Sequence, residues 1–250
     1  MARYQLILAY DGTDFQGFQR QGKKRTVQAE VETALRRLNW QGRTILAAGR
    51  TDSGVHASGQ VIAFDLDWAH PPDVLARALN AYLPKDVAVQ SACLAADDFH
   101  PRYQARYRLY RYRLFCKAER NPLLERFALR VWPPVEPDRL QAAAQLFIGT
   151  HDFAAFGSPP RPGGSTIRTV FHAFWEAQAN GWQFEVAANA FLYRMVRRLV
   201  FLQVLAGQGR LSLPDLAQGV TQAQMQTPGL APPQGLTLAE VGYDLQKQES

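Results

Sequence analysis

The chain of 250 residues has no apolar run approaching the 18 or so residues that a membrane-spanning helix requires. It holds only two cysteines, Cys93 and Cys116, and both stand in apolar or strand-like surroundings, so we expect two small buried side chains and no disulfide framework. The five histidines show neither HxxxH nor CxxC-type spacing, which predicts no metal site. Because Met1 to Tyr10 already alternates like a strand, we also expect no signal peptide and a cytoplasmic location without membrane association.

Lysine is scarce as well. Only five of the 28 basic residues are lysine, while 22 residues are acidic, which gives a net charge of +6. Arginine suits phosphate because its planar fork donates two parallel hydrogen bonds and stacks on bases. The balance favours a polyanionic partner, although a general bias toward arginine would give the same count.

The loop DGTDFQGFQRQGKKR at residues 11–25 lacks the GxxxxGK[ST] pattern of a phosphate-binding loop, and its glycine spacing does not match GxGxxG. We therefore predict no nucleotide hydrolysis and no nucleotide cofactor. Arg20, Lys23 and Lys24 in this loop either contact an RNA backbone or form a solvated turn.

The order of predicted elements in the first hundred residues is strand, helix, two strands, helix, strand. Their ranges are 3–10, 27–39, 43–49, 60–66, 71–83 and 86–94. This order is typical of a split βαβ unit with an antiparallel sheet and helices on one face. A loop between two strands of such a sheet would hold Asp52 beside the open sheet face.

The second half begins again with a strand-like run at 107–115. Beyond it the pattern predicts a helix at 137–149, a hairpin at 169–178 and 181–189, a long helix at 191–207 and a strand at 240–245. We therefore predict an α+β protein of two split-βαβ (ferredoxin-like) domains with antiparallel sheets, at residues 1–104 and 105–250.

The most informative stretch is AGRTDSGVHASGQV at residues 48–61. It places the carboxylate of Asp52 between Arg50 and a run of small residues, directly before a predicted strand. Arg50 can hold the carboxylate ionised, since a nearby opposite charge favours the charged form. Small residues leave room for a bulky ligand to approach the backbone. The alternative is a polar hairpin loop with a local Arg–Asp contact.

The motif GRTDSGVHA resembles the catalytic motif of the TruA family of tRNA pseudouridine synthases. Other landmarks follow in the same order, namely YDGTDFQGFQRQ, TVQAEVETAL, FHPRY, RLYRY, HDFAAF, FLYRMVRRLV and APPQGLTL. Together they span nearly the whole chain. The resemblance implies that the two sheets join around a central cleft and that Asp52 is the catalytic carboxylate.

Three further residues take roles from this resemblance. Tyr110 is implied as a stacking tyrosine, Arg197 as the partner of the catalytic carboxylate, and Leu236 as a contact to the base. Their plain interpretations differ: Tyr110 and Leu236 as core residues, and Arg197 as solvated or phosphate-bound. Arg106, Arg108, Arg194 and Arg198 are candidates for contacts to the RNA backbone.

The family isomerises uridines at positions 38 to 40 of the anticodon stem-loop, so the resemblance implies a tRNA substrate, base flipping and a homodimer. The reaction consumes no redox cofactor, metal or nucleotide. Two alternatives remain. One is a non-catalytic tRNA-binding or chaperone protein with the same fold. The other is a carboxylate-based hydrolase, which needs a second positioned carboxylate that the sequence does not offer.

Overall fold

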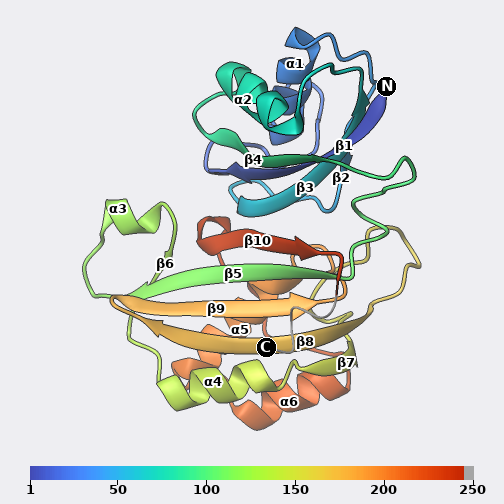
Figure 1. Cartoon of the computed structure of the whole chain (residues 1–250). Helices are drawn as coiled ribbons and strands as arrows, with labels where there is room; N and C mark the ends of the chain where they lie inside the picture. Colours follow the sequence, from blue (N-terminus) through green and yellow to red (C-terminus); the bar gives the residue numbers. More distant parts are fainter. Residues whose placement is uncertain (245–250) are drawn as a thin grey trace. The chain divides into compact units, whose positions relative to one another are not determined.

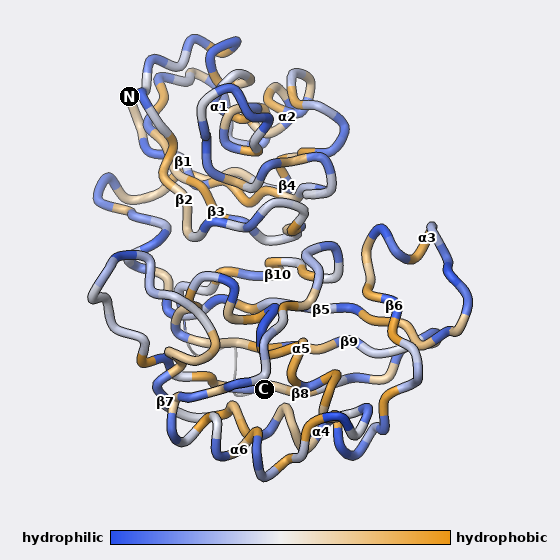
Figure 2. Tube along the Cα trace, turned by 180° about the vertical axis from the view of Figure 1, so that it is seen from behind, coloured by the Kyte–Doolittle hydropathy of each residue, from blue (hydrophilic) through white to orange (hydrophobic). Residues whose placement is uncertain are grey.

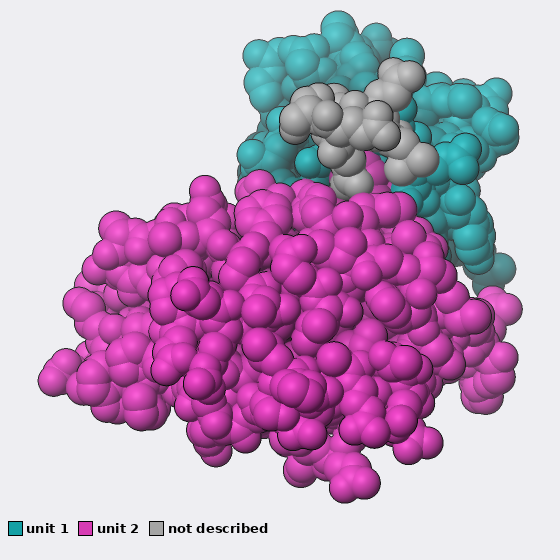
Figure 3. All heavy atoms as spheres, turned by 90° about the horizontal axis from the view of Figure 1, so that it is seen from below, with its two compact units in different colours: residues 1–106, 237–250 teal, residues 107–236 magenta. Residues whose placement is uncertain are grey.

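The computed structural model describes residues 1–244, which form two compact units (Figure 3). Unit 1 holds residues 1–106 together with the chain from Thr237 onward, and unit 2 holds Tyr107–Leu236. Both mix strands and helices, as the sequence predicts, so the α+β class is confirmed. Within the described residues no helix is long and apolar enough to cross a membrane.

Unit 1 is built on an antiparallel sheet with helices α1 and α2 on one face (Figure 1). Its elements are β1 (Ala2–Tyr10), α1 (Val27–Arg37), β2 (Leu46–Ala47), β3 (His56–Leu66), α2 (Pro72–Tyr82) and β4 (Val87–Leu94), joined by β10 (Leu236–Gly242). β1 pairs with β4 on one side and with β3 on the other. The other edge of β3 pairs with β2 and, in parallel, with β10. The first six elements follow the predicted βαββαβ order.

The core of unit 1 follows from alternation along β1, whose buried side chains are Tyr4, Leu6, Leu8 and Tyr10. These residues lie on one face of the sheet because side chains alternate along a strand. Apolar residues also gather on β3, as the orange segments of Figure 2 show. The sequence places Cys93 in a buried strand, but the side chain is exposed, because the last five residues of the edge strand β4 are mostly exposed.

Unit 2 contains strands β5, β9, β8 and β7, which pair in that order and antiparallel, and β6, which pairs with β5 in parallel. Its elements are β5 (Tyr107–Cys116), α3 (Pro122–Glu125), β6 (Leu129–Val131), α4 (Pro137–Gln145), β7 (Gly149–Asp152), β8 (Ile167–Gln178), β9 (Gly181–Ala188), α5 (Met195–Gly207), α6 (Leu213–Thr221) and η1 (Pro233–Gly235). The predicted hairpin is confirmed, since Gln178 pairs with Gly181 across a two-residue turn.

Three predicted boundaries in the second half differ. The helix predicted at 137–149 ends at Gln145, and Gly149 already begins β7. The long helix begins at Met195, four residues later than predicted, because Arg194 adopts a left-handed backbone conformation with φ 63°. The predicted strand at 240–245 starts earlier, as β10, and pairs with β3 of unit 1. Its last residue, Leu245, lies outside the described residues.

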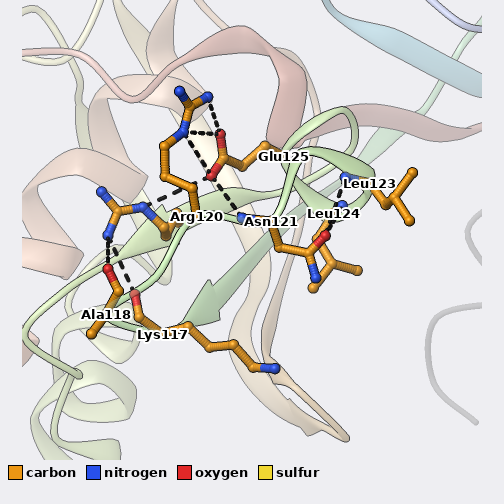
Figure 4. Close-up of polar contacts among 8 residues, drawn as sticks. Lys117, Ala118, Arg120, Asn121, Leu123, Leu124 and Glu125 are labelled. Carbon is orange, nitrogen blue, oxygen red and sulfur yellow. Dashed lines mark hydrogen bonds and ion pairs between the residues drawn. The ribbon is translucent and has the colours of Figure 1, made fainter.

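A short excursion between β5 and β6 carries α3 (Figure 4). The Asn121 side chain accepts hydrogen bonds from the backbone N–H groups of Leu123 and Leu124, which caps the helix. Arg120 lies 2.7 Å from the Glu125 carboxylate, and this partner lowers the pKa of Glu125. These local contacts order a segment that has few apolar residues to bury.

Candidate active site

The Asp52 loop, residues 48–55, joins β2 to β3 in unit 1. The strand begins at His56, earlier than predicted, so only Ser53, Gly54 and Val55 separate Asp52 from a paired strand. Asp52 is half-buried and Arg50 is exposed. A reacting carboxylate needs a fixed backbone, and the end of β3 provides one side of it.

Two buried polar side chains hold this loop from the core of unit 1. The Tyr10 hydroxyl shares a hydrogen bond of 2.8 Å with the Thr51 hydroxyl, and Gln60 donates from Nε2 to the Gly49 carbonyl oxygen at 3.0 Å. Gln60 is fully buried, and burial raises the pKa of Tyr10 to about 12. These contacts fix Gly49, directly before Arg50, and Thr51, directly before Asp52. We call Tyr10, Thr51 and Gln60 the buried frame.

The loop at 11–18 holds the opposite side of the Asp52 loop. The Phe18 N–H donates to the Thr51 carbonyl oxygen at 3.1 Å, and the Gly54 N–H donates to the Phe15 carbonyl oxygen at 3.3 Å. The Ser53 hydroxyl also donates to Phe15, at 3.1 Å. Gly17 fits here because it has φ +84° and a methyl group on it would lie 2.8 Å from the Thr51 oxygen. The DGTDFQG segment therefore clamps the Asp52 loop.

Farther along the same loop, Arg20 has a protein partner. Its Nη1 lies 2.6 Å from the carboxylate of Glu32, whose side chain is almost completely buried on α1. Gln28 donates to the same carboxylate at 2.8 Å, and the Ile45 N–H donates to it at 3.3 Å. A buried carboxylate requires such partners. Arg20 thus has a structural role that the sequence did not reveal, and its contact with RNA remains a prediction.

The remaining basic candidates of unit 1 are at the surface. Lys23 and Lys24 lie in the exposed turn of residues 21–24, where the Lys24 N–H donates to the Gln21 carbonyl oxygen. Arg106 is exposed just before β5. Their charges lie where an RNA phosphate can reach them.

Tyr110 lies on β5 in unit 2, opposite Val186 of β9. Side chains alternate along a strand, so Tyr110 shares one face of β5 with Arg108 and Tyr112. Arg108 donates to the Asn189 carbonyl oxygen at 3.0 Å. Tyr112 is the core tyrosine of this strand: it is fully buried, and its hydroxyl donates to the Pro232 carbonyl oxygen at 2.9 Å. Tyr110 is only half-buried, and the edge of its ring meets Phe191 at a centroid distance of 5.0 Å.

Arg197 and Arg198 lie in the first turn of α5 and are both half-buried. Arg197 donates from Nε to the Ala231 carbonyl oxygen at 2.8 Å, and the Ala231 N–H donates back to the Arg197 carbonyl oxygen. Arg198 donates to the carbonyl oxygens of Gly229, at 2.9 Å, and Thr227. Burial lowers the pKa of Arg198. We call residues 227–231 the α5 strap.

Both arginines are therefore partly covered by the α5 strap, and whether they also contact phosphate stays a prediction. Leu236, five residues beyond the strap, is buried at the start of β10. Arg194 is exposed. The apolar side of the segment 191–207 is buried and includes Leu192, Met195, Val196, Leu199 and Leu202.

Metal ligands are not grouped in residues 1–244, where no cluster of three His, Cys, Asp or Glu side chains is found. Unit 1 offers one carboxylate on a hydrogen-bonded loop, and unit 2, taken by itself, offers aromatic and cationic residues on β5 and α5. Such a set suits a reaction at a sugar carbon of a nucleotide, where a carboxylate meets developing positive charge.

Comparison with known proteins supports an enzyme that acts on a nucleotide. The profile of a family described as tRNA pseudouridine synthase matches residues 6–104 and 143–244. The Asp52 loop, α5 and the strap all fall within the matched ranges. The chain therefore belongs to the tRNA pseudouridine synthase family.

Individual relatives match over nearly their full length. A tRNA pseudouridine synthase A from Streptococcus equi subsp. equi is 38% identical over 248 residues, covering 98% of this chain and 100% of the relative. One from Chloroflexus aurantiacus is 41% identical over 246 residues, with 95% and 87% covered. One from Shouchella clausii is 37% identical over 245 residues, with 97% and 94% covered.

Proposed function

We propose that this chain isomerises uridine to pseudouridine in tRNA, with Asp52 as the reacting carboxylate. The observation that supports the proposal most strongly is the Asp52 loop itself. Its neighbours Thr51, Ser53 and Gly54 are all hydrogen-bonded to the buried frame or to the clamping loop, which leaves a half-buried carboxylate on a fixed backbone. The proposed reaction is taken from the family to which the chain belongs, described as tRNA pseudouridine synthase.

The reaction breaks the C1′–N1 bond of uridine, turns the base and forms a C1′–C5 bond. The hydrogen on C5 leaves as a proton, and N1 gains one, so substrate and product are isomers. The carboxylate of Asp52 faces the sugar in this proposal, and the detached base stays in the pocket. Attack on C1′, removal of a sugar proton and addition to the base are three possible roles for that carboxylate.

The other residues of the proposal bind and orient the base. Tyr110 offers a half-buried ring, which suits stacking on uracil better than the fully buried Tyr112. Following the resemblance, we place Arg197 beside the Asp52 carboxylate and Leu236 against the base. Arg197 donates from Nε to the Ala231 carbonyl oxygen of the α5 strap, which orients its planar guanidinium.

The proposed targets are uridines 38, 39 and 40 of the anticodon stem-loop, which must be flipped out of the helix to reach a carboxylate. We further propose a cytoplasmic homodimer that binds tRNA through exposed basic residues, among them Lys23, Lys24, Arg106 and Arg194. Light scattering of the purified protein tests the dimer, for which a single-chain mass is the contradicting result.

Chemical mapping of pseudouridine on tRNA tests the function. The wild-type protein is incubated with unmodified tRNA transcripts that carry uridine at 38, 39 or 40. We expect pseudouridine at these positions and none at uridines outside the anticodon stem-loop. Tight tRNA binding without any pseudouridine would instead identify a non-catalytic RNA-binding protein, and product at other positions would contradict the proposed target.

A further inference from the structure

The segment between β9 and α5 presents two aromatic rings in different directions. Phe191 meets the ring of Tyr110, whereas Tyr193, two residues on, is 52% exposed. The guanidinium of Arg194 lies 4.8 Å from the centroid of the Tyr193 ring. We call Tyr193 and Arg194 the Tyr193 platform.

The backbone of the platform is fixed. The Tyr193 N–H donates to the Ser158 carbonyl oxygen at 2.9 Å, and the Ser158 N–H donates back to Tyr193 at 3.3 Å. The residue before Ser158 must be glycine for this approach, because a methyl group on Gly157 would lie 2.8 Å from the Tyr193 carbonyl oxygen. An exposed ring on a fixed backbone loses little conformational freedom when a ligand stacks on it.

The conformation of Arg194 is also unusual. It has φ 63°, a left-handed conformation that L side chains other than asparagine rarely adopt. Such strain persists only where the surrounding contacts impose it, and it gathers at functional sites. Here it places a guanidinium over an exposed ring, in a cation–π contact.

The side chains of the Tyr193 platform indicate which kind of ligand it can bind. The guanidinium of Arg194 lies over one face of the Tyr193 ring, and the ring is 52% exposed, which leaves the other face for a ligand. Such a pair matches a nucleobase attached to a phosphate, because the base stacks on the open face and the guanidinium binds the phosphate. Phe191 and Tyr193 are two residues apart, so their Cα atoms lie within about 8 Å of each other. The platform is therefore close to the Tyr110–Phe191 pair, at which we place the target base.

We propose that the Tyr193 platform is a second base-binding site, which stacks the nucleotide next to the target uridine. The inference rests on the proposed function, because that function brings an RNA strand to Tyr110. It adds a subsite of its own: one ring holds the flipped uracil, and a second ring holds a neighbouring base whose stacking in the RNA is disturbed by the flip.

The test uses anticodon stem-loop RNAs with the fluorescent base 2-aminopurine on the 5′ side of the target uridine in one and on the 3′ side in the other. Binding is measured by anisotropy, and stacking by quenching of the probe. The variants are Tyr193→Phe, Tyr193→Leu and Tyr193→Ala. Tyr82→Ala is the matched control, because Tyr82 is 55% exposed at the end of α2.

We expect Tyr193→Ala and Tyr193→Leu to weaken binding by roughly 5- to 100-fold and to abolish quenching of one probe, whereas Tyr193→Phe binds as the wild type does. Leucine keeps apolar bulk without an aromatic face. Weak binding and lost quenching in Tyr193→Leu would therefore show that the contact is stacking. Thermal melting checks that each variant is folded.

The platform is overturned if folded Tyr193→Ala binds and quenches as Tyr82→Ala does, or if Tyr193→Leu retains quenching. A different result would contradict the proposed function: the wild-type protein would form no pseudouridine in the stem-loop. A wild-type protein that makes pseudouridine but quenches neither probe refutes the platform alone.

Discussion

The Asp52 loop and the first turns of α5 are both held rigidly, but by opposite means. The Asp52 loop depends on neutral side chains in the core of unit 1, namely Tyr10, Thr51 and Gln60. The start of α5 instead uses charged side chains, since Arg197 and Arg198 donate to backbone carbonyl oxygens of the α5 strap. The Asp52 loop is thus held by the neutral groups of its frame, whereas Arg197 and Arg198 in part serve the fold.

This comparison changes how the basic residues are interpreted. An excess of arginine predicts phosphate contacts, yet Arg20 pairs with buried Glu32 and Arg198 donates to two carbonyl oxygens. The exposed residues Lys23, Lys24 and Arg194 are then the better candidates for binding RNA. Position in the fold decides which positive charges remain for a ligand.

Among the residues proposed to surround the catalytic carboxylate, the largest effect is expected from Arg197→Met. If Arg197 pairs with Asp52, its loss leaves a half-buried carboxylate without its cation, which costs about 3 kcal/mol, or roughly 100-fold in single-turnover rate. Affinity for tRNA should change much less. The measurement is a single-turnover time course at saturating enzyme.

Arg198→Met is the matched control, because Arg198 holds the same α5 strap through Gly229 and Thr227. We expect it to lower the melting temperature while keeping most of the single-turnover rate. Equal loss of rate in both variants would mean that Arg197 acts only through the strap.

The second-largest effect is expected from Tyr110→Ala, which should lose roughly 1–3 kcal/mol of base stacking. The measurements are the affinity for tRNA and the rate of pseudouridine formation. Tyr110→Phe keeps the ring, and so should keep most of the binding. A Tyr110→Ala protein that melts at a much lower temperature, with unchanged kinetics per folded molecule, would make Tyr110 a core residue like Tyr112.

Tyr10→Phe tests the buried frame. Loss of the hydrogen bond to Thr51 should cost about 1 kcal/mol of folding free energy and lower kcat by about tenfold, with KM nearly unchanged. Tyr4→Phe is the control, because Tyr4 is buried on the same face of β1. If both variants lose stability alone and keep kcat, the frame does not position Asp52.

The smallest effect concerns the exposed turn. Lys23→Gln and Lys24→Gln should each reduce the salt dependence of tRNA binding, lowering the slope of log affinity against log salt by about 0.9 for each phosphate that the protein no longer neutralises. Folding free energy should be unaffected, since both side chains are exposed. An unchanged slope would place both lysines outside the RNA interface.

Much of the fold could be predicted from local pattern. Alternation along residues 3–10 and helical spacing over 27–37 correspond to β1 and α1, and the hairpin at Gln178 and Gly181 follows from its two-residue turn. The start of α5 could not be predicted, because the left-handed conformation of Arg194 depends on neighbouring tertiary contacts rather than on spacing.

The interactions around the site could not be predicted either, because they too are tertiary contacts between distant segments. Thr51 meets Tyr10 from 41 residues away, and Arg197 meets Ala231 from 34 residues away. A single sequence shows which residues share a strand or a helix face, but not which distant segment covers that face. The motif predicts that Asp52 is the reacting carboxylate, and only the structure revealed which contacts hold its loop.

The most direct test of the central claim compares wild-type protein and Asp52→Asn on tRNA labelled with tritium at C5 of uridine. Only formation of the C1′–C5 bond expels that hydrogen, so release into water reports the isomerisation itself. We predict release by the wild type and almost none by Asp52→Asn, whose melting temperature and tRNA affinity remain close to those of the wild type. Near-normal release by the folded Asp52→Asn protein would remove Asp52 from the chemistry and contradict this account.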